Sequence, residues 1–482
     1  MSTTGAPFTS KAPKLGLVGG FDGIRGIGVC MVLVGHALFI YFESLVTIVD
    51  TFFVLSGFLI TTLLLQEHRS TGDIGLRKFY ARRAVRLLPS VWLFCGVWIV
   101  IGIIGSLLGI LSLRGILEDA AAAVTYVYHL FFPNGLYMID PATQDNRVMW
   151  HLWTLSVEEW FYFAIPATVL VCVRRNRVKL LGWILGVLVA AIALCRWFAI
   201  TGFFQDDTSM ISGVRLFFLQ RPDALMLGAL VAIINAHLTP ERVERLKRPI
   251  VVAASVALVV WVFTLVTSFG LFEKLGLPYF KYLPDGPDQF SRPQMLAQSP
   301  TYWFRWGHTL GALAFAVILM GLVHCRHWWL ARFWSLPPFQ WLGRLSYTLY
   351  VWHALPYILI FALTGGEDVS PAVQLIRTPV MIAAAFAVSL PVYYLVELRV
   401  LRVKLRFSAE KEALDLSTGK MVRVEDGKVV GHVEGPDTAP VAPAAPSGGS
   451  APAAPPVAPP TTSNGSGRDG APDSSGAPTS NQ

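Results

Sequence analysis

Two ionisable side chains stand eleven residues apart in the stretch RGIGVCMVLVGH, residues 25–36, where every residue between them is apolar or glycine. Eleven residues make about three turns of a helix, so Arg25 and His36 share one face about 16 Å apart along the axis. A histidine, with a reference pKa of about 6.5, is suited to take a proton near neutral pH. Ionisable residues inside a membrane are costly and usually face a cavity, so the pair is a candidate functional site. The alternative is an arginine that reaches toward water and a histidine hydrogen-bonded to a neighbouring helix.

Three arginines cluster in FYARRAVRLLP, residues 79–89. Arg82 and Arg86 share a helix face, and Arg83 flanks them. Because planar guanidinium forks fit phosphate oxygens, the cluster is a candidate anion site. The alternative is that it only sets the membrane topology of the apolar run that Pro89 opens.

A pair of carboxylates interrupts the stretch WHLWTLSVEEWFYF, residues 150–163. Adjacent residues point about 100° apart on a helix, so at most one of Glu158 and Glu159 faces a given cavity. Glu158 shares its face with Tyr162. Glu158 is therefore a candidate active-site carboxylate, or else an acceptor for a neighbouring helix.

Two further apolar segments carry polar groups. Asp223 lies in QRPDALMLG, residues 220–228, and LGRLSYTLYVWH, residues 342–353, carries Ser346, Tyr350 and His353. The last three follow an i, i+4, i+7 pattern and form one polar stripe on a helix. Ionisable groups inside a membrane are costly and usually face a cavity or a partner, so we treat these residues as candidate pocket residues. Simple hydrogen bonding within a bundle is the alternative.

The elements that must position these groups are membrane helices. The chain has 482 residues, of which 54% are hydrophobic and 15% charged, and its mean hydropathy is +0.54. A soluble domain carries about a quarter charged residues. Long apolar runs recur, so we expect an all-α, polytopic helical bundle of about ten transmembrane helices. The expected spans lie near residues 22–42, 46–66, 88–110, 152–172, 179–200, 214–236, 249–271, 304–323, 340–363 and 372–397.

The charge distribution predicts the orientation of this bundle. The net charge of +8 sits mainly in short loops, so we expect a lipid bilayer and no nucleic acid as its partner. Loops on one side of the ten spans carry 22 Lys and Arg residues, against 5 on the other side. Basic loops stay inside, so both termini should be cytoplasmic and the protein should lie in the cell membrane. We expect no cleaved signal peptide, and the run at 117–132 is too short and polar to cross.

Four segments follow from this reading. Residues 1–20 form a cytoplasmic segment, and residues 21–400 form the membrane domain. Residues 401–435 are basic next to the membrane, and MVRVEDGKVVGHV within them alternates around Asp-Gly, which predicts a short hairpin. Residues 436–482 are rich in Pro, Ala, Gly and Ser and should be disordered. The five scattered cysteines predict neither disulfides nor a metal site.

Taken together, these motifs resemble integral-membrane acyltransferase family 3. The resemblance covers about residues 20–400 and rests on the Arg25–His36 spacing and on five further motifs in order: FFVLSGFLI, FYARRAVRLLP, WTLSVEEWFY, RPDALMLG and SYTLYVWH. It implies transfer of an acyl group, often acetyl, from cytoplasmic acyl-coenzyme A to a hydroxyl of a glycan, glycolipid or similar acceptor. Acyl-coenzyme A would be a co-substrate, with no bound cofactor. Some members carry a C-terminal hydrolase-like domain, and we expect none here.

The resemblance also implies roles for the candidate residues. His36 would be the general base, and Glu158 or Asp223 would orient it or bind the sugar. Arg25 would hold the coenzyme A phosphates together with Arg82, Arg83 and Arg86, while Ser346, Tyr350 and His353 would line the pocket. Nothing in the residues selects direct transfer over an acyl-enzyme relay. The alternative from another class is a multi-pass secondary transporter that uses the same intramembrane charges, although no internal repeat of the kind found in transporters is evident.

The charge asymmetry makes a prediction about topology. A C-terminal reporter that is active only outside the cell should stay silent, because the last basic loop should be cytoplasmic. The same reporter fused near residue 140, in an expected outer loop, is the matched control and should be active. An active C-terminal fusion would contradict the ten-span topology.

Overall fold

The computed structural model describes residues 18–38, 42–131, 148–198, 220–282, 302–365 and 369–400, together with three strands between residues 412 and 432. The chain divides into a unit Met1–Gly435 and a unit Pro436–Gln482. The second unit holds the tail that we expected to be disordered, and it lies outside the described residues.

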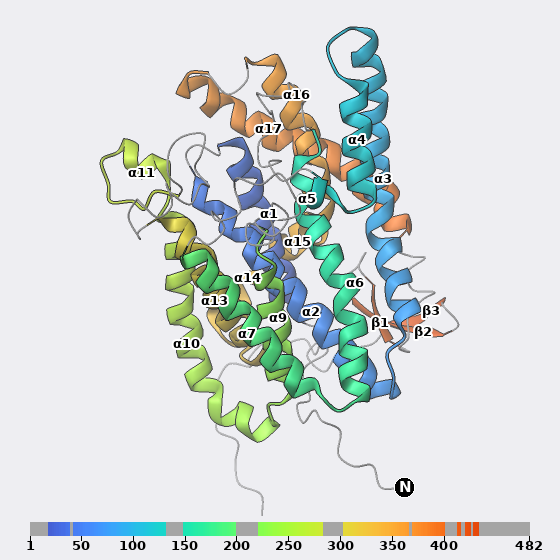
Figure 1. Cartoon of the computed structure of the whole chain (residues 1–482), viewed down its shortest axis with the longest axis vertical. Helices are drawn as coiled ribbons and strands as arrows, with labels where there is room; N and C mark the ends of the chain where they lie inside the picture. Colours follow the sequence, from blue (N-terminus) through green and yellow to red (C-terminus); the bar gives the residue numbers. More distant parts are fainter. Residues whose placement is uncertain are drawn as a thin grey trace, which may run out of the picture. The chain divides into compact units, whose positions relative to one another are not determined.

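Helices make up the described membrane domain, so the expected all-α class is confirmed (Figure 1). The α-helices are α1 (Gly19–Ala37), α2 (Thr47–Thr71), α3 (Leu76–Leu107), α4 (Leu113–Val124), α5 (Tyr128–Phe131), α6 (Trp153–Arg174), α7 (Val178–Trp197), α9 (Pro222–Ala236), α10 (Pro240–Val266), α11 (Gly270–Lys274), α13 (Trp303–His324), α14 (Trp329–Trp334), α15 (Pro337–Trp352), α16 (Ala354–Leu363) and α17 (Pro371–Val392). Two 3-10 helices, η3 (Glu43–Val46) and η4 (Trp150–Leu152), and one π-helix, η6 (Tyr393–Glu397), complete the helical set.

The protein is a multi-pass membrane protein. Within the described ranges, seven helical segments are long and apolar enough to cross a bilayer, or eight if α15 and α16 count as one span bent by 50°. Each of the ten expected spans corresponds to a helix or a pair of helices. Helices α1 and α9, however, are not both long and apolar enough to be counted among the membrane-crossing segments. Helix α9 has only 15 residues, and α1 carries Asp22, Arg25 and six glycines. The count of ten therefore stays a prediction.

Two helices differ from their expected form. Helix α3 begins at Leu76 and continues through Pro89, so the arginine cluster lies on the spanning helix itself and not in a loop before it. Proline removes one backbone hydrogen bond but need not end a helix whose other contacts hold it. The expected span 340–363 is bent at His353, where α15 gives way to α16. The weaker run at 117–132 corresponds to the short helices α4 and α5, as a partial helix in a connection.

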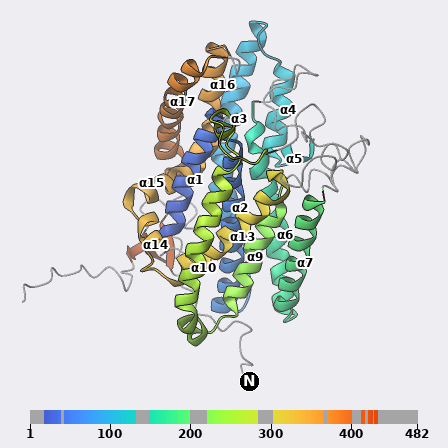
Figure 2. The ribbon, with the colours of Figure 1, turned by 90° about the vertical axis from the view of Figure 1, so that its left-hand side faces the viewer.

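Glycines let two helix pairs approach to backbone contact. Helix α1 packs along α15 (Figure 2), where a Cβ added to Gly343 would lie 1.9 Å from the carbonyl oxygen of Asp22. Helix α2 packs along α9 in the same way, because a Cβ on Gly57 would lie 2.1 Å from the Leu225 carbonyl oxygen. In lipid, helices associate through such close packing, since burying apolar surface gives little drive between them.

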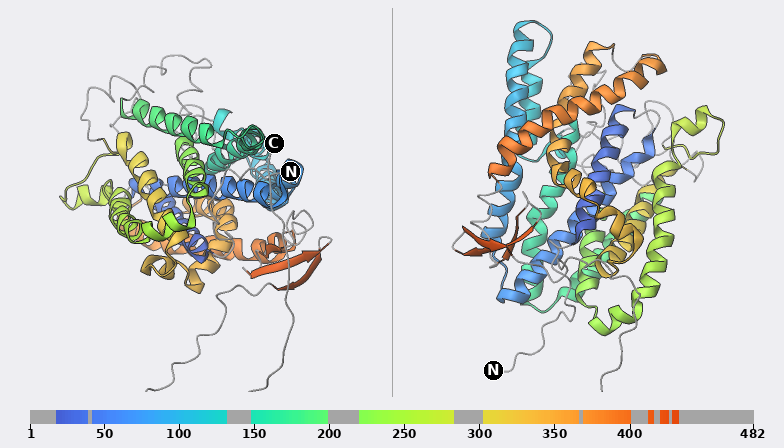
Figure 3. Two further views of the ribbon diagram at one scale, coloured as in Figure 1. Left: turned by 90° about the horizontal axis from the view of Figure 1, so that it is seen from below. Right: turned by 180° about the vertical axis from the view of Figure 1, so that it is seen from behind.

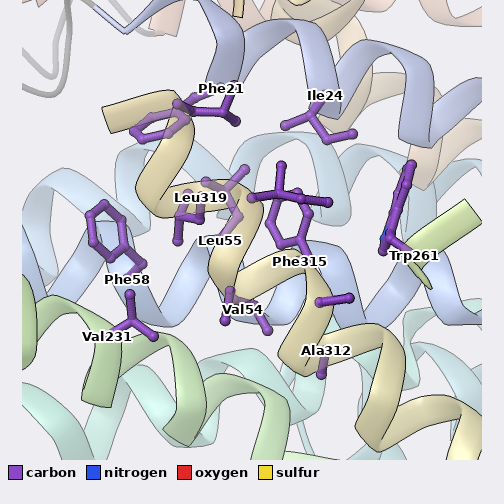
Figure 4. Close-up of a cluster of buried hydrophobic side chains, with 14 of the residues drawn as sticks. Phe21, Ile24, Val54, Leu55, Phe58, Val231, Trp261, Ala312, Phe315 and Leu319 are labelled. Carbon is purple, nitrogen blue, oxygen red and sulfur yellow. The ribbon is translucent and has the colours of Figure 1, made fainter. Parts of the chain in front are cut away.

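The main apolar core lies between α1, α2, α9, α10 and α13. Phe21 and Ile24 of α1 face Leu55 and Phe58 of α2 and Phe315 of α13 in this core (Figure 4). Of the helices that could cross a membrane, α2 and α13 are the most enclosed, because 67% of the residues in the apolar stretch of each are buried. The core therefore fixes α1 from the side opposite α15.

A small sheet follows the last helix (Figure 3). The alternating stretch forms strands β2 (Lys420–Glu425) and β3 (Lys428–His432), which pair antiparallel, with a register shift between Arg423 and Val424. Strand β1 (Glu412–Asp415) adds a third antiparallel strand, which the sequence did not predict.

The glycine contacts make a prediction about stability. Gly343→Ala should destabilise the folded protein by about 1–3 kcal/mol, because its methyl group would overlap the α1 backbone and force the helices apart. Gly96→Ala on α3 is the matched control, since nothing lies within 4 Å of its added Cβ. Thermal unfolding of both variants in detergent should lower the midpoint only for the first. Equal midpoints would contradict the close α1–α15 packing.

Candidate active site

A hydrogen-bonded pair of histidines joins the end of α1 to the bend between α15 and α16. His36 Nδ1 lies 2.8 Å from His353 Nε2, and the two rings stack with centroids 5.0 Å apart. The side chain of His353 is buried, whereas His36 is only half-buried. One ring thus lies in the bundle interior, and the other keeps part of its surface exposed.

The second ring nitrogen of His36, Nε2, is not used in the bond to His353. Nε2 makes no hydrogen bond to the described part of the chain, and the edge of Trp150 packs against the ring at a centroid distance of 4.8 Å. A nitrogen held in place by its ring but left without a protein partner is free to interact with a substrate hydroxyl. This arrangement is what a general base requires.

The start of α6 and the end of α15 are tied together behind this pair. The Tyr350 hydroxyl lies 2.5 Å from the Thr154 hydroxyl and donates to the His151 carbonyl oxygen. His151 Nε2 in turn lies 3.1 Å from the Val351 carbonyl oxygen, to which it donates. The predicted pocket residue Tyr350 therefore lies beside the histidine pair and holds two segments in register. Ser346, in contrast, donates to the carbonyl of Gly343 in its own helix, at 2.7 Å.

A second group of charges connects α3 to α6. Arg83 Nε donates to Glu159 at 2.7 Å, and an Arg83 Nη2 atom lies 3.9 Å from Glu158. The Arg83 guanidinium also stacks 3.3 Å from the ring centroid of Tyr162, and Ser56 donates to Glu158 at 2.8 Å. The sequence singled out Glu158, but the structure pairs both carboxylates with the same arginine.

Arg86 differs from its neighbours because it has no ion pair or hydrogen bond within the described ranges. It is half-buried on α3, within electrostatic range of Arg25, Arg83 and Glu397. Arg25 makes one long ion pair, of 3.7 Å, to Asp22 in its own helix. The positive charges of Arg25 and Arg86 thus lie near each other, and nearby carboxylates neutralise them only in part. Such a site attracts an anion, and a forked guanidinium suits phosphate.

Glu397 is a neighbour of this site that sequence reasoning missed. The π-helix η6 holds it, and its buried carboxylate accepts a hydrogen bond from Thr348 of α15. Single-turn π-helices often occur at functional sites. The available signal was an acidic residue at the end of the apolar run 372–397.

Arg82 points to the turn between α2 and α3 instead. It lies 3.3 Å from Glu67, which also accepts from the backbone N–H of Gly75 at 2.9 Å. In the same turn, Asp73 pairs with Arg174 at 3.0 Å. The pKa of the exposed Asp73 carboxyl is lowered, first by the backbone N–H of Ile74 and then by Arg174. Arg82 therefore belongs to the contacts that hold this turn.

Asp223 lies in a separate buried network and not beside His36. Two Arg196 nitrogens donate to its carboxylate at 2.8 and 3.1 Å. Asp50 accepts from His308 Nδ1 at 2.7 Å and from Arg221 at 3.2 Å in the same network. Of these five residues, the sequence motifs single out only Asp223 as a site residue, although each of the five interrupts or borders an apolar run.

The residues that the structure describes contain no group of three or more His, Cys, Asp and Glu side chains suited to a metal ion. The candidate site has two parts. The first is the His36–His353 pair, in which His36 Nε2 has no hydrogen bond to the described residues. The second is the cluster of Arg83 with its two glutamates, beside which Arg86 has no ion pair in the described ranges. These features define a multi-pass helical membrane protein with ionisable groups in its interior.

The chain belongs to acyltransferase family 3. The family model, described as an acyltransferase domain, matches residues 18–397, which include every predicted site residue. The family that the motifs suggested is therefore confirmed.

The relatives that the chain resembles include two O-acetyltransferases called OatA. The chain is 26% identical over 379 residues to the peptidoglycan O-acetyltransferase OatA of Listeria monocytogenes, covering 76% of this chain and 53% of that protein. It is 26% identical over 336 residues to the O-acetyltransferase OatA of Staphylococcus aureus, covering 69% of this chain and 49% of that protein. The chain thus spans about half the length of these relatives. No solved structure matches the chain.

Proposed function

We propose that this protein is an O-acyltransferase that moves an acyl group, such as acetyl, from cytoplasmic acyl-coenzyme A to a hydroxyl of a cell-surface glycan. The observation that carries the proposal is the open Nε2 of His36 in a bundle whose arginine cluster leaves Arg86 without a partner in the described ranges. The family match and the names of the two OatA relatives support acyl transfer and a glycan acceptor.

His36 serves as the general base in this proposal. Its Nε2 removes the proton from the acceptor hydroxyl as the oxygen attacks the thioester carbonyl. The new C–O bond forms, the C–S bond breaks, and the departing thiolate takes the proton back from Nε2. Each step conserves atoms and charge, and no metal or further reactant is required.

Arg86 and Arg25 bind the phosphates of the donor. Arg86 lies on α3 near Arg83, which Glu159 already neutralises. The phosphate charge would compensate the cationic excess of this cluster. Arg25 and His36 lie eleven positions apart on α1, about 16 Å along the helix, which leaves room for an extended donor between them.

The vertical order of these groups suits transfer across the membrane. With both termini cytoplasmic, as the charge count predicts, Arg25 lies toward the cytoplasm and His36 lies farther along α1. The donor would enter from the cytoplasm and the acceptor from the other side. A secondary transporter using the same charges is the weaker alternative, because the family match covers nearly the whole membrane domain.

One prediction concerns the donor. Arg86→Gln should raise the KM for acyl-coenzyme A about tenfold or more, and leave the KM for the acceptor unchanged, because a charge-assisted bond contributes about 1.5–3 kcal/mol. Arg86→Lys should also raise it, since lysine cannot bind two oxygens as a planar fork. Arg82→Gln is the control, because Arg82 contacts Glu67 at the α2–α3 turn. Steady-state kinetics of the purified variants measure both constants, and equal changes for both substrates would contradict donor binding.

Another prediction concerns the base. His36→Gln should lower turnover by about 10²–10⁴-fold, because glutamine keeps the hydrogen bonding but cannot take a proton. Wild-type turnover should fall as the pH falls, since a protonated imidazole cannot act as a base. The measurement is acetyl transfer from labelled acetyl-coenzyme A to glycan fragments by protein in lipid nanodiscs.

The matched control for His36→Gln is His324→Gln on α13. That histidine also lies in a membrane span, where its Nε2 lies 2.7 Å from Asn235, but it lies outside the histidine pair. It should keep near-normal turnover. Near-normal turnover of His36→Gln would instead overturn the proposed function.

A further inference from the structure

His353 has one nitrogen whose role is fixed by its surroundings. Its Nδ1 lies 2.7 Å from the Tyr350 carbonyl oxygen and 3.2 Å from that of Leu349. Carbonyl oxygens only accept hydrogen bonds, so Nδ1 must carry the proton. Both acceptors lie in the last turn of α15, which ends at Trp352, where carbonyls can lack helical N–H partners. The Leu349 carbonyl also accepts from the His353 backbone N–H at 3.0 Å, so the Tyr350 carbonyl is the closer partner of Nδ1.

The proton on Nδ1 determines the rest of the chain of hydrogen bonds. Neither ring is bonded to a carboxylate in the described ranges, so we treat both as neutral. A neutral imidazole has one N–H, and Nε2 of His353 is therefore an acceptor. The 2.8 Å bond between the rings then requires that His36 Nδ1 donates. The lone pair of His36 is left on Nε2, the nitrogen without a partner.

We propose that His353 is the positioning residue that fixes the tautomer of His36 and so makes Nε2 the base. The inference rests on the proposed acyl transfer. Catalytic histidines are commonly oriented by a carboxylate that accepts from Nδ1. Here the neutral imidazole of His353 takes the place of that carboxylate. The carbonyls of Leu349 and Tyr350 accept from its Nδ1–H and so hold the ring in its orientation.

This arrangement also determines where the proton goes. When Nε2 of His36 takes the proton from the acceptor hydroxyl, the O–H bond breaks and an N–H bond forms. His353 stabilises the resulting imidazolium through the Nδ1–H bond. It cannot pass a proton onward, because the carbonyls behind it do not accept one. The proton therefore stays on His36 until the thiolate leaves and takes it.

Helix packing keeps His353 in place. The backbone contact at Gly343 brings α15 against α1, and Tyr357 of α16 donates to the Leu33 carbonyl of α1 at 3.1 Å. The Tyr357 ring also packs against His353, with centroids 5.4 Å apart. The bend is thus fixed to α1 on both sides of the histidine pair.

Two substitutions at one position separate positioning from mere packing. In His353→Gln the amide oxygen can accept from His36 Nδ1–H, and we expect turnover within a few fold of wild type. In His353→Leu no acceptor remains, and we expect kcat to fall about 10–100-fold, as for partners that orient a functional histidine. The KM values for both substrates should stay within about twofold, because neither variant alters the arginine cluster. Equal loss in both variants, or a change in KM alone, would overturn the inference.

Nitrogen-15 NMR of histidine-labelled protein in nanodiscs gives a direct readout. The His36 signal, assigned by its loss in His36→Gln, should show the Nδ1–H tautomer in the wild type and a shift toward Nε2–H in His353→Leu. A wild-type Nε2–H tautomer would overturn the inference even if the leucine variant fails to fold. If His36→Gln is inactive while His353→Leu behaves as wild type, this inference alone fails. If His36→Gln is active, the proposed function itself fails.

Discussion

Helices α1 and α15 touch backbone to backbone, and the geometry of the site depends on that contact. A Cβ at Gly26 would lie 2.3 Å from the Phe339 carbonyl oxygen, and one at Gly343 would lie 1.9 Å from that of Asp22. A side chain at either position would overlap the facing backbone, so one helix would have to shift away from the other. The bond between His36 and His353 exists because the two helices meet at these glycines and α15 bends where His353 stands. In lipid, packing of this kind supplies most of the specificity between helices.

The two charged groups inside the bundle differ in how completely they are compensated. In the network of α2, α7, α9 and α13, Asp50 pairs with Arg221 and Asp223 pairs with Arg196. Both pairs are buried, and their contacts tie four helices together. Such closed pairs are expensive to break and suit a structural role. In the group around α3, Arg83 is satisfied by Glu159, whereas Arg86 has no ion pair in the described part of the bundle.

The same contrast applies to the histidines. His308 uses Nδ1 toward Asp50 and Nε2 toward Tyr282, at 2.7 and 2.9 Å, so both of its ring nitrogens are engaged. His36 uses one nitrogen toward His353 and leaves the other open. The intramembrane groups that remain open are the ones that we assign to substrates. Those that are closed hold the helices in the positions that the open groups need.

The sequence by itself determined the helical membrane fold, the family and the residues on each helix face, because hydropathy and the 3.6-residue period are local properties. It placed Arg25 and His36 on one face, and Ser346, Tyr350 and His353 on one stripe. The tertiary structure decided which candidates meet. It joined His353 to His36, turned Arg82 toward Glu67, and placed Asp223 with Arg196. It also brought in Glu397 through a π-helix and bent α15 from α16 at His353. These outcomes depend on contacts between helices far apart in the chain, and no local pattern encodes which glycine meets which backbone or which arginine is left without a carboxylate.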